Sequence, residues 1–143
     1  DVRAVGRELG IPTDLLNRHP FPRSGLAIRV LGAVDAESLE RARAADHVFL
    51  EELRNADLYD RIYQAGCILL PVDVAGLVGE ARTYARPVVL RAVTSADSTS
   101  ADWARIPDDV LARISDRILR EVDGINRVVY DISRKPPATI EWE

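Results

Sequence analysis

Three side chains are of types that can act as a nucleophile, a base or a phosphate ligand. Each of them can also have a purely structural role. Cys67 is the only cysteine and lies in the apolar run at residues 65–70. We predict a buried structural thiol there, because a free cysteine usually packs as a small hydrophobe. His19 precedes a proline, and we expect it to form structural hydrogen bonds rather than to act as a base. Lys135 precedes two prolines in the C-terminal tail, where a lysine can either stay in solvent or bind a phosphate.

The motifs, the net charge and the apolar stretches of the sequence disfavour several classes of function. The sequence has no Ser-Gly-Gly loop, no cysteine in a nucleophile elbow, and no cysteine and histidine spacing suited to zinc. A net charge of −4 gives no long-range attraction to nucleic acid or to anionic lipid. No apolar stretch reaches the roughly 20 residues that span a bilayer, and no signal peptide is visible.

The cellular setting follows from residue counts. The lone cysteine cannot form an internal disulfide, which suits a reducing compartment, and we predict a cytoplasmic location. The sequence contains no methionine, and we expect it to be a fragment or a processed piece of a longer protein.

Two long helices should carry the architecture of this 143-residue chain, which is short enough for one domain. The first runs over residues 36–55 with Asp35 as its N-cap. The second begins at Pro107 and stops at Gly124. Its apolar residues repeat every four positions: Val110, Ile114, Ile118 and Val122.

Four stretches have the composition of strands: residues 26–31, 62–72, 82–94 and 125–132. Pro87 predicts either a free edge or an irregularity in the third strand. Towards the N-terminus we expect a helix over residues 1–9 and a short one from Thr13, as its cap, to Arg18.

These elements predict an α+β fold: a two-layer sandwich in which two long helices cover one face of a mainly antiparallel four-stranded sheet. The second face carries Ala, Val and Leu beside Arg. We therefore expect that face to pair with another subunit.

Longer motifs add a family resemblance that covers nearly the whole chain in order. They are HPFP at residues 19–22, GLAIRV at 25–30, LRAVTS at 90–95, ADWAR at 101–105, NRVVYDIS at 126–133 and KPPATIEWE at 135–143. Together they resemble the C-terminal dimerisation domain of glutamine-hydrolysing GMP synthases. The resemblance implies residues 1–18 as a helical lead-in from an ATP-pyrophosphatase domain and residues 19–143 as the dimerisation and XMP-binding domain.

The resemblance also implies a reaction and partners. GMP synthases convert XMP to GMP with ATP, magnesium and ammonia from glutamine, and separate domains hydrolyse glutamine and adenylate XMP. The C-terminal domain forms a homodimer, contacts its own ATP-pyrophosphatase domain and helps to hold XMP. We therefore expect this chain to bind no cofactor or metal itself and to be inactive alone.

The family's binding residues fall on the tail and the lead-in. By resemblance, Lys135 and Arg18 contact the XMP phosphate, and Glu141 contacts the purine edge. Thr139 either donates its hydroxyl to the phosphate or simply lies in extended chain. For the dimer interface we expect Arg29, Trp103 and Arg127 to contribute, although Arg29 could instead pair with a carboxylate and Trp103 could be a packing anchor. These are the candidate site residues.

Some positions depart from the family pattern, at Arg23, Asp73, Val78 and Ala81. Val78 replaces a residue that can be a glutamine facing the nucleotide, and a valine can neither donate nor accept a hydrogen bond. One alternative is therefore a dimerising module that no longer binds XMP. A small α+β nucleic-acid binder is a further alternative, which the acidic balance disfavours.

Overall fold

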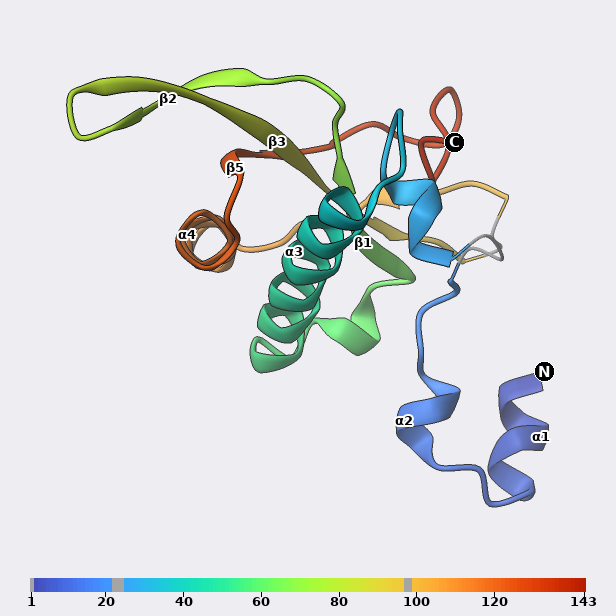
Figure 1. The fold of residues 1–143 in the computed structure, drawn as a ribbon. Helices are drawn as coiled ribbons and strands as arrows, with labels where there is room; N and C mark the ends of the chain where they lie inside the picture. The colour runs from blue at the N-terminus through green and yellow to red at the C-terminus, as the bar shows by residue number, and fades with distance from the viewer. Residues whose placement is uncertain (1, 22–24, 97–98) are drawn as a thin grey trace.

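Two long helices, α3 (Ala36–Asn55) and α4 (Asp108–Glu121), pack against one five-stranded sheet (Figure 1). The computed structural model describes residues 2–21, 25–96 and 99–143. Helix α3 lies along the sheet and α4 runs beside it. The predicted α+β class with helices packed on a sheet is confirmed, with five strands where the sequence predicted four.

Helix α3 has the predicted bounds, and its N-cap explains where it begins. Asp35 is in an extended conformation, and its Oδ1 accepts the Ser38 N–H at 2.7 Å, which satisfies a backbone donor that the first turn would leave unpaired. Farther along, Phe49 and Leu53 are fully buried. The two helices are also joined by an ion pair, since Arg117 reaches the buried Glu52 at 2.7 Å.

Strand β3 (Ala81–Thr94) is the centre of the sheet, with β1 (Gln64–Leu69), β2 (Val74–Val78), the short β4 (Asp102–Trp103) and β5 (Ile125–Tyr130) all paired to it. Strands β1, β2 and β4 run antiparallel to β3, and β5 runs parallel to it. A parallel neighbour needs a long crossover connection. Helix α4 supplies it, which is why the last strand follows this helix directly.

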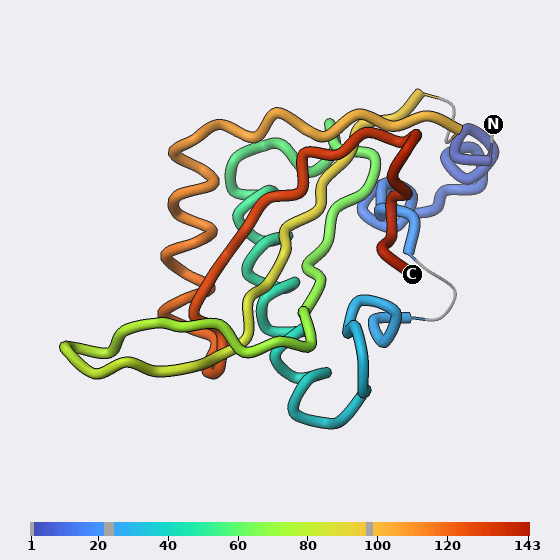
Figure 2. Tube along the Cα trace, turned by 90° about the horizontal axis from the view of Figure 1, so that it is seen from above, coloured from blue at the N-terminus to red at the C-terminus, as the bar shows by residue number. Residues whose placement is uncertain are grey.

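Pro87 interrupts β3 at the point where its partners change. The register shifts between Arg86 and Pro87, so the predicted irregularity is confirmed. The alternative of a free edge is wrong, because β3 is the central strand. Before the shift, β3 pairs with β2, which the sequence analysis missed, and the two strands form a hairpin that projects past the helices (Figures 1 and 2).

Two local predictions near the N-terminus are wrong. Residues 26–31 form no strand: Gly25–Arg29 is a 3-10 helix, η1, followed by a single bridge from Val30 to Leu69. A repeat of three residues per turn places Leu26 and Arg29 on the same side, and there Leu26 packs on the core and Arg29 is buried. In addition Thr13 lies inside α2 (Thr13–Leu16), and Pro12 occupies its N-cap position.

The second face of the sheet is largely covered by the chain itself. Ile68, Val89 and Val93 alternate with the residues that face the helices, and all three are buried. Ile140 and Glu141 of the C-terminal tail line the same narrow gap, of about 10 Å³, as Ile68. The area of this face that a second subunit could cover is therefore smaller than the sequence analysis expected.

Helices α1 (Val2–Glu8) and α2 stand apart from the sheet as a small pair of their own (Figure 1). They meet where Gly6 faces the Leu16 side chain, whose terminal methyl would lie 2.5 Å from a Cβ at that position. Within the described parts of the chain, none of the helices has the length and apolarity needed to cross a membrane.

Candidate functional site

The candidate site is the C-terminal tail, residues 131–142, which leaves β5 and folds back across the sheet. Arg91, on β3 and only 3% exposed, donates to main-chain carbonyls on both sides of Lys135. Its Nη1 reaches the Ser133 oxygen at 2.6 Å and its Nη2 reaches the Thr139 oxygen at 2.8 Å. Five residues of chain between these anchors form a loop with Lys135 in it.

Arg29 fixes the tail a second time, at Glu141. Its Nη2 donates to Glu141 Oε1 at 2.8 Å and its Nε to Oε2 at 3.2 Å, a two-pronged pairing that sets the plane of the carboxylate. On the other side, its Nη1 reaches Asp46 of α3 at 3.4 Å. Gly66 makes room for this side chain, because a Cβ there would lie 2.1 Å from Arg29 Nη1.

The neighbouring carboxylates keep the buried Arg29 guanidinium ionised. Burial by itself would lower the pKa of Arg29, but the hydrogen bond to Glu141 and the nearby charges of Glu141 and Asp46 raise the pKa above its usual value. For Asp46 burial dominates and raises the pKa of the carboxyl, with Arg29 and the Cys67 N–H acting against it. The guanidinium is thus a permanent cation joining helix, sheet and tail.

Lys135 lies on the loop that Arg91 closes, and it is the only lysine of the chain. Its backbone pairs with Ala101 through two hydrogen bonds, of 3.0 and 2.9 Å. It lines an open cavity of about 330 Å³ together with Ser100, Asp102 and Arg134. The position suits an anion, since Arg134 and Lys135 outnumber Asp102, which is paired with Arg134 at 3.0 Å.

The remaining predicted ligands are placed differently. The Thr139 hydroxyl donates to the Glu141 carbonyl within the tail, and the Glu141 carboxylate is bound by Arg29 and by Gln64. Its Oε2 has one described donor, at 3.2 Å. Since a carboxylate oxygen can accept two hydrogen bonds, Oε2 retains capacity for a ligand N–H.

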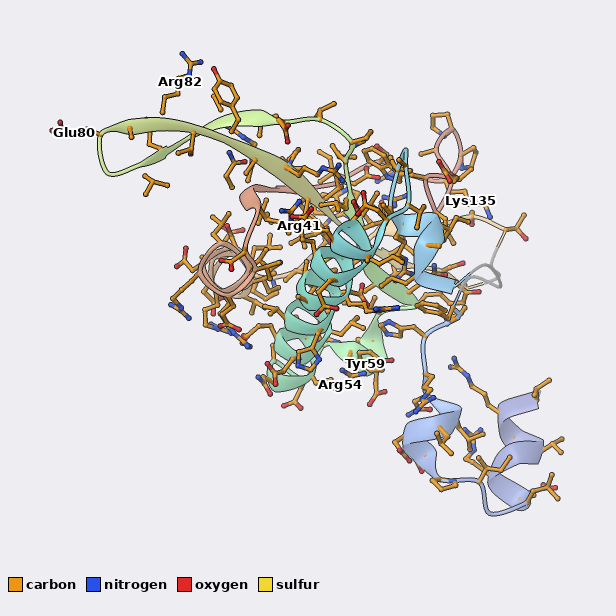
Figure 3. The ribbon with its side chains drawn as sticks, viewed as in Figure 1. Arg41, Arg54, Tyr59, Glu80, Arg82 and Lys135 are labelled. Carbon is orange, nitrogen blue, oxygen red and sulfur yellow. The ribbon has the colours of Figure 1, made fainter. Side chains whose placement is uncertain are left out.

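Arg18 lies in a different cavity from the tail. It lines a space of about 580 Å³ with Asp14 of α2, Arg54 near the end of α3 and Tyr59 just beyond that helix. Arg54 lies in the last turn of α3 and Tyr59 in the short 3-10 helix η2 (Tyr59–Arg61) that follows, whereas Lys135 comes from the tail (Figure 3). The structure therefore groups Lys135, Thr139 and Glu141 on one segment and does not bring Arg18 into the cavity that Lys135 lines.

The residues expected at a dimer interface have partners within the chain. Arg29 is 2% exposed and bound to carboxylates, so the carboxylate alternative is the one observed. A direct contact of Arg29 with a second subunit is wrong, because its guanidinium is covered. Trp103 packs edge-on against Tyr130 at 5.9 Å and lies under Arg105. Arg127 is exposed and reaches the Ala75 carbonyl at 3.3 Å.

The structural predictions for His19 and Cys67 are confirmed. The Ala65 N–H donates to His19 Nδ1 at 3.2 Å, so the proton is on Nε2, which donates to the Tyr59 carbonyl at 2.9 Å. The imidazole stacks on the Tyr59 ring at 3.9 Å. Cys67 is fully buried, and burial raises the pKa of its thiol well above the usual value, which suppresses the reactive thiolate.

The family departures fall on the hairpin. Asp73 precedes β2, while Val78 and Ala81 face each other at its tip, where Val78 is 71% exposed. Arg23 lies outside the described residues. Among the residues that the structure describes, no group of three or more His, Cys, Asp or Glu side chains is arranged to hold a metal ion.

Comparison with known proteins decides the family. The family described as "GMP synthase C terminal domain" matches residues 51–142. The chain belongs to this family. It is 60% identical over all 143 residues to a GMP synthase [glutamine-hydrolyzing] of Chlorobium limicola and 55% identical to that of Aquifex aeolicus. In both cases it spans 28% of the relative's length.

For this GMP synthase C-terminal domain, sequence reasoning missed the residues that hold the tail. Arg91 lies in the LRAVTS motif at residues 90–95, but a strand position gives no indication that its guanidinium binds carbonyls some 40 residues later. Gly66 was likewise seen only as part of an apolar run. The space that Gly66 leaves is filled by Arg29, which comes from a segment far away in the sequence, so the glycine gave no local sign of its role.

Proposed function

We propose that this chain is the C-terminal homodimerisation and XMP-binding part of a GMP synthase, and that it acts in the cytoplasm. The observation that carries the proposal is the anchored tail, in which Lys135 lies on a loop closed by a buried arginine. A preformed loop lowers the ordering cost of binding. The amination of XMP, with its ATP and magnesium, belongs to the longer protein, and the chain alone is expected to be inactive.

In this arrangement Lys135 supplies an ammonium group to the XMP phosphate. Glu141 offers Oε2 to an N–H of the purine, and such a contact discriminates between bases because a base without that N–H leaves a buried acceptor unpaired. Arg18 would have to reach the nucleotide from the lead-in cavity or from another subunit. Dimerisation is supported by exposed apolar side chains on the hairpin, on β5 and at the start of the tail: Leu77, Val129 and Ile132, which are 74%, 41% and 60% exposed.

Calorimetric titration of the chain with XMP tests the nucleotide site. We expect Lys135→Ala to weaken binding at least about tenfold, and Arg120→Ala, which removes the same charge from the outer side of α4, to leave it unchanged. Because Lys135 is the only lysine, XMP should also slow its acylation by an amine-reactive reagent. Equal binding by wild-type chain and Lys135→Ala would refute the assignment of this lysine.

The alternative is a dimerising module that no longer binds XMP. It is favoured by Val78, an exposed residue at the hairpin tip that offers the nucleotide no hydrogen bond. No heat of binding at millimolar XMP, with a dimeric mass in solution, would support this alternative instead.

A further inference from the structure

We infer that Arg91 is a positioning residue that closes the Lys135 loop, and that it thereby sets where the ammonium group of Lys135 lies. The role of Lys135 as a phosphate ligand rests on the proposed function. The closure of the loop by Arg91 rests on the contacts alone.

The described hydrogen bonds of the Arg91 guanidinium all go to one segment, the C-terminal tail. The guanidinium donates to four main-chain oxygens, two before Lys135 and two after it: Asp131 at 3.3 Å, Ser133 at 2.6 Å, Thr139 at 2.8 Å and Ile140 at 3.3 Å. It also lies 3.4 Å from Asp131 Oδ2. A rigid fork of five N–H donors can satisfy several carbonyls at fixed angles, which a lysine ammonium cannot reproduce.

The location of Arg91 gives these bonds their strength. The residue is 3% exposed and lies on the central strand, directly opposite Gly66 of β1. Hydrogen bonds from a charged donor in a buried site are among the stronger ones in proteins. The loop is consequently fixed to the most firmly paired strand of the sheet.

Other contacts also restrain the loop between the Ser133 and Thr139 anchors. The Ala138 N–H donates to the Arg134 carbonyl at 3.0 Å, and the backbone of Lys135 pairs with Ala101. Trp142 Nε1 donates to Asp131 Oδ2 at 2.9 Å, beyond the second anchor. The Ala138 and Trp142 bonds also join chain on the two sides of Lys135, but each is a single hydrogen bond. Arg91 supplies two bonds on each side from one buried group. Loss of Arg91 therefore removes most of the described hydrogen bonds that hold the two ends of the loop together.

Hydrogen–deuterium exchange on Arg91→Lys and Arg91→Met tests the closure without any ligand. We expect exchange of the Lys135 and Ala138 amides, which donate to the Ala101 and Arg134 carbonyls, to rise at least about tenfold while those of β1 stay protected, as in a local opening. Arg86→Lys is the matched control, the same change on the same strand at a side chain that bonds Ser38 on α3. The inference is overturned if tail exchange is unchanged, if β1 and the tail lose protection together, or if Arg86→Lys loosens the tail equally.

Titration with XMP then separates this inference from the proposed function. If the wild-type chain binds XMP, Arg91→Lys should weaken binding at least about tenfold and Arg86→Lys should not; unchanged affinity of Arg91→Lys would refute the positioning role. If the wild-type chain does not bind XMP, the proposed function fails, and the exchange data alone decide whether Arg91 closes the loop.

Discussion

Arg29 and Glu141, 112 positions apart in the sequence, form a two-pronged ion pair in which the Nη2 to Oε1 distance is 2.8 Å. The pair joins a short helix near the N-terminus to the last turn of the tail. Asp46 holds the other side of the same guanidinium. Three segments of the chain thus share one buried cation.

Removing this cation should be costly. We predict that Arg29→Ala lowers the free energy of unfolding by about 3–5 kcal/mol, because it leaves two carboxylates without their buried partner. Chemical denaturation of both proteins measures the difference. Arg43→Ala on α3, where the side chain is 63% exposed, should change stability by less than about 0.5 kcal/mol. Similar effects of the two substitutions would contradict the structure.

Gly66 should be coupled to Arg29. A methyl group at Gly66 would lie 2.3 Å from Arg29 Cζ, so we predict that Gly66→Ala displaces the guanidinium and destabilises the chain. In an Arg29→Ala background the same substitution meets no such obstacle, and most of its cost should disappear. A double-mutant cycle from denaturation curves gives the coupling. Additive effects would show that the glycine serves some other purpose.

His19 should make stability depend on pH. Burial, first of all, lowers the pKa of His19 below its ordinary value of 6.5, and the nearby Arg54 and Arg29 act in the same direction, while the Tyr59 carbonyl and Asp60 oppose them. The neutral ring is needed because Nδ1 accepts the Ala65 N–H. Below pH 6.5 the unfolded chain takes up a proton that the folded chain resists, so the stabilisation by His19 is present above pH 6.5 and is lost as pH falls through the lowered pKa.

The measurement compares wild-type chain with His19→Gln from pH 8 to pH 5. We expect the stability advantage of the wild-type chain to be constant at the upper end and to shrink below pH 6.5. Taking the difference between the two proteins removes the contribution of every other titrating group that the substitution leaves unaltered. A difference that grows as pH falls would mean that the folded protein prefers the charged imidazole.

The exposed apolar side chains of β5 and of the start of the tail should mediate self-association. We predict that Ile132→Asp, at a residue 60% exposed just after β5, shifts the chain from dimer to monomer in sedimentation experiments, because a desolvated carboxylate without a partner opposes the interface. Leu119→Asp is the control, at an apolar residue 41% exposed on α4. Dissociation by Leu119→Asp alone would place the interface on the helices instead.

The sequence determined the elements whose signals are local. The Asp35 cap and the apolar repeat of α4 need only neighbours within a turn or two. Helix α3 begins where the pattern indicates, and α4 begins one residue later than predicted, with Pro107 at its N-cap position. Pro87 marked the irregularity of β3 because a proline lacks the N–H that a ladder requires. The tail motif at residues 135–143 pointed to the family in the same local way.

Only the tertiary structure decided what the arginines do. Residues 26–31 coil rather than extend because Arg29 is buried beside Asp46 and Glu141. The order of apolar and polar residues within this six-residue segment carries no information about those distant partners. Likewise, Arg91 finds its acceptors on a segment about 40 residues later. Such pairings stabilise the fold through contacts that exist only after β1, β3 and the tail have come together, so no spacing in the sequence encodes them.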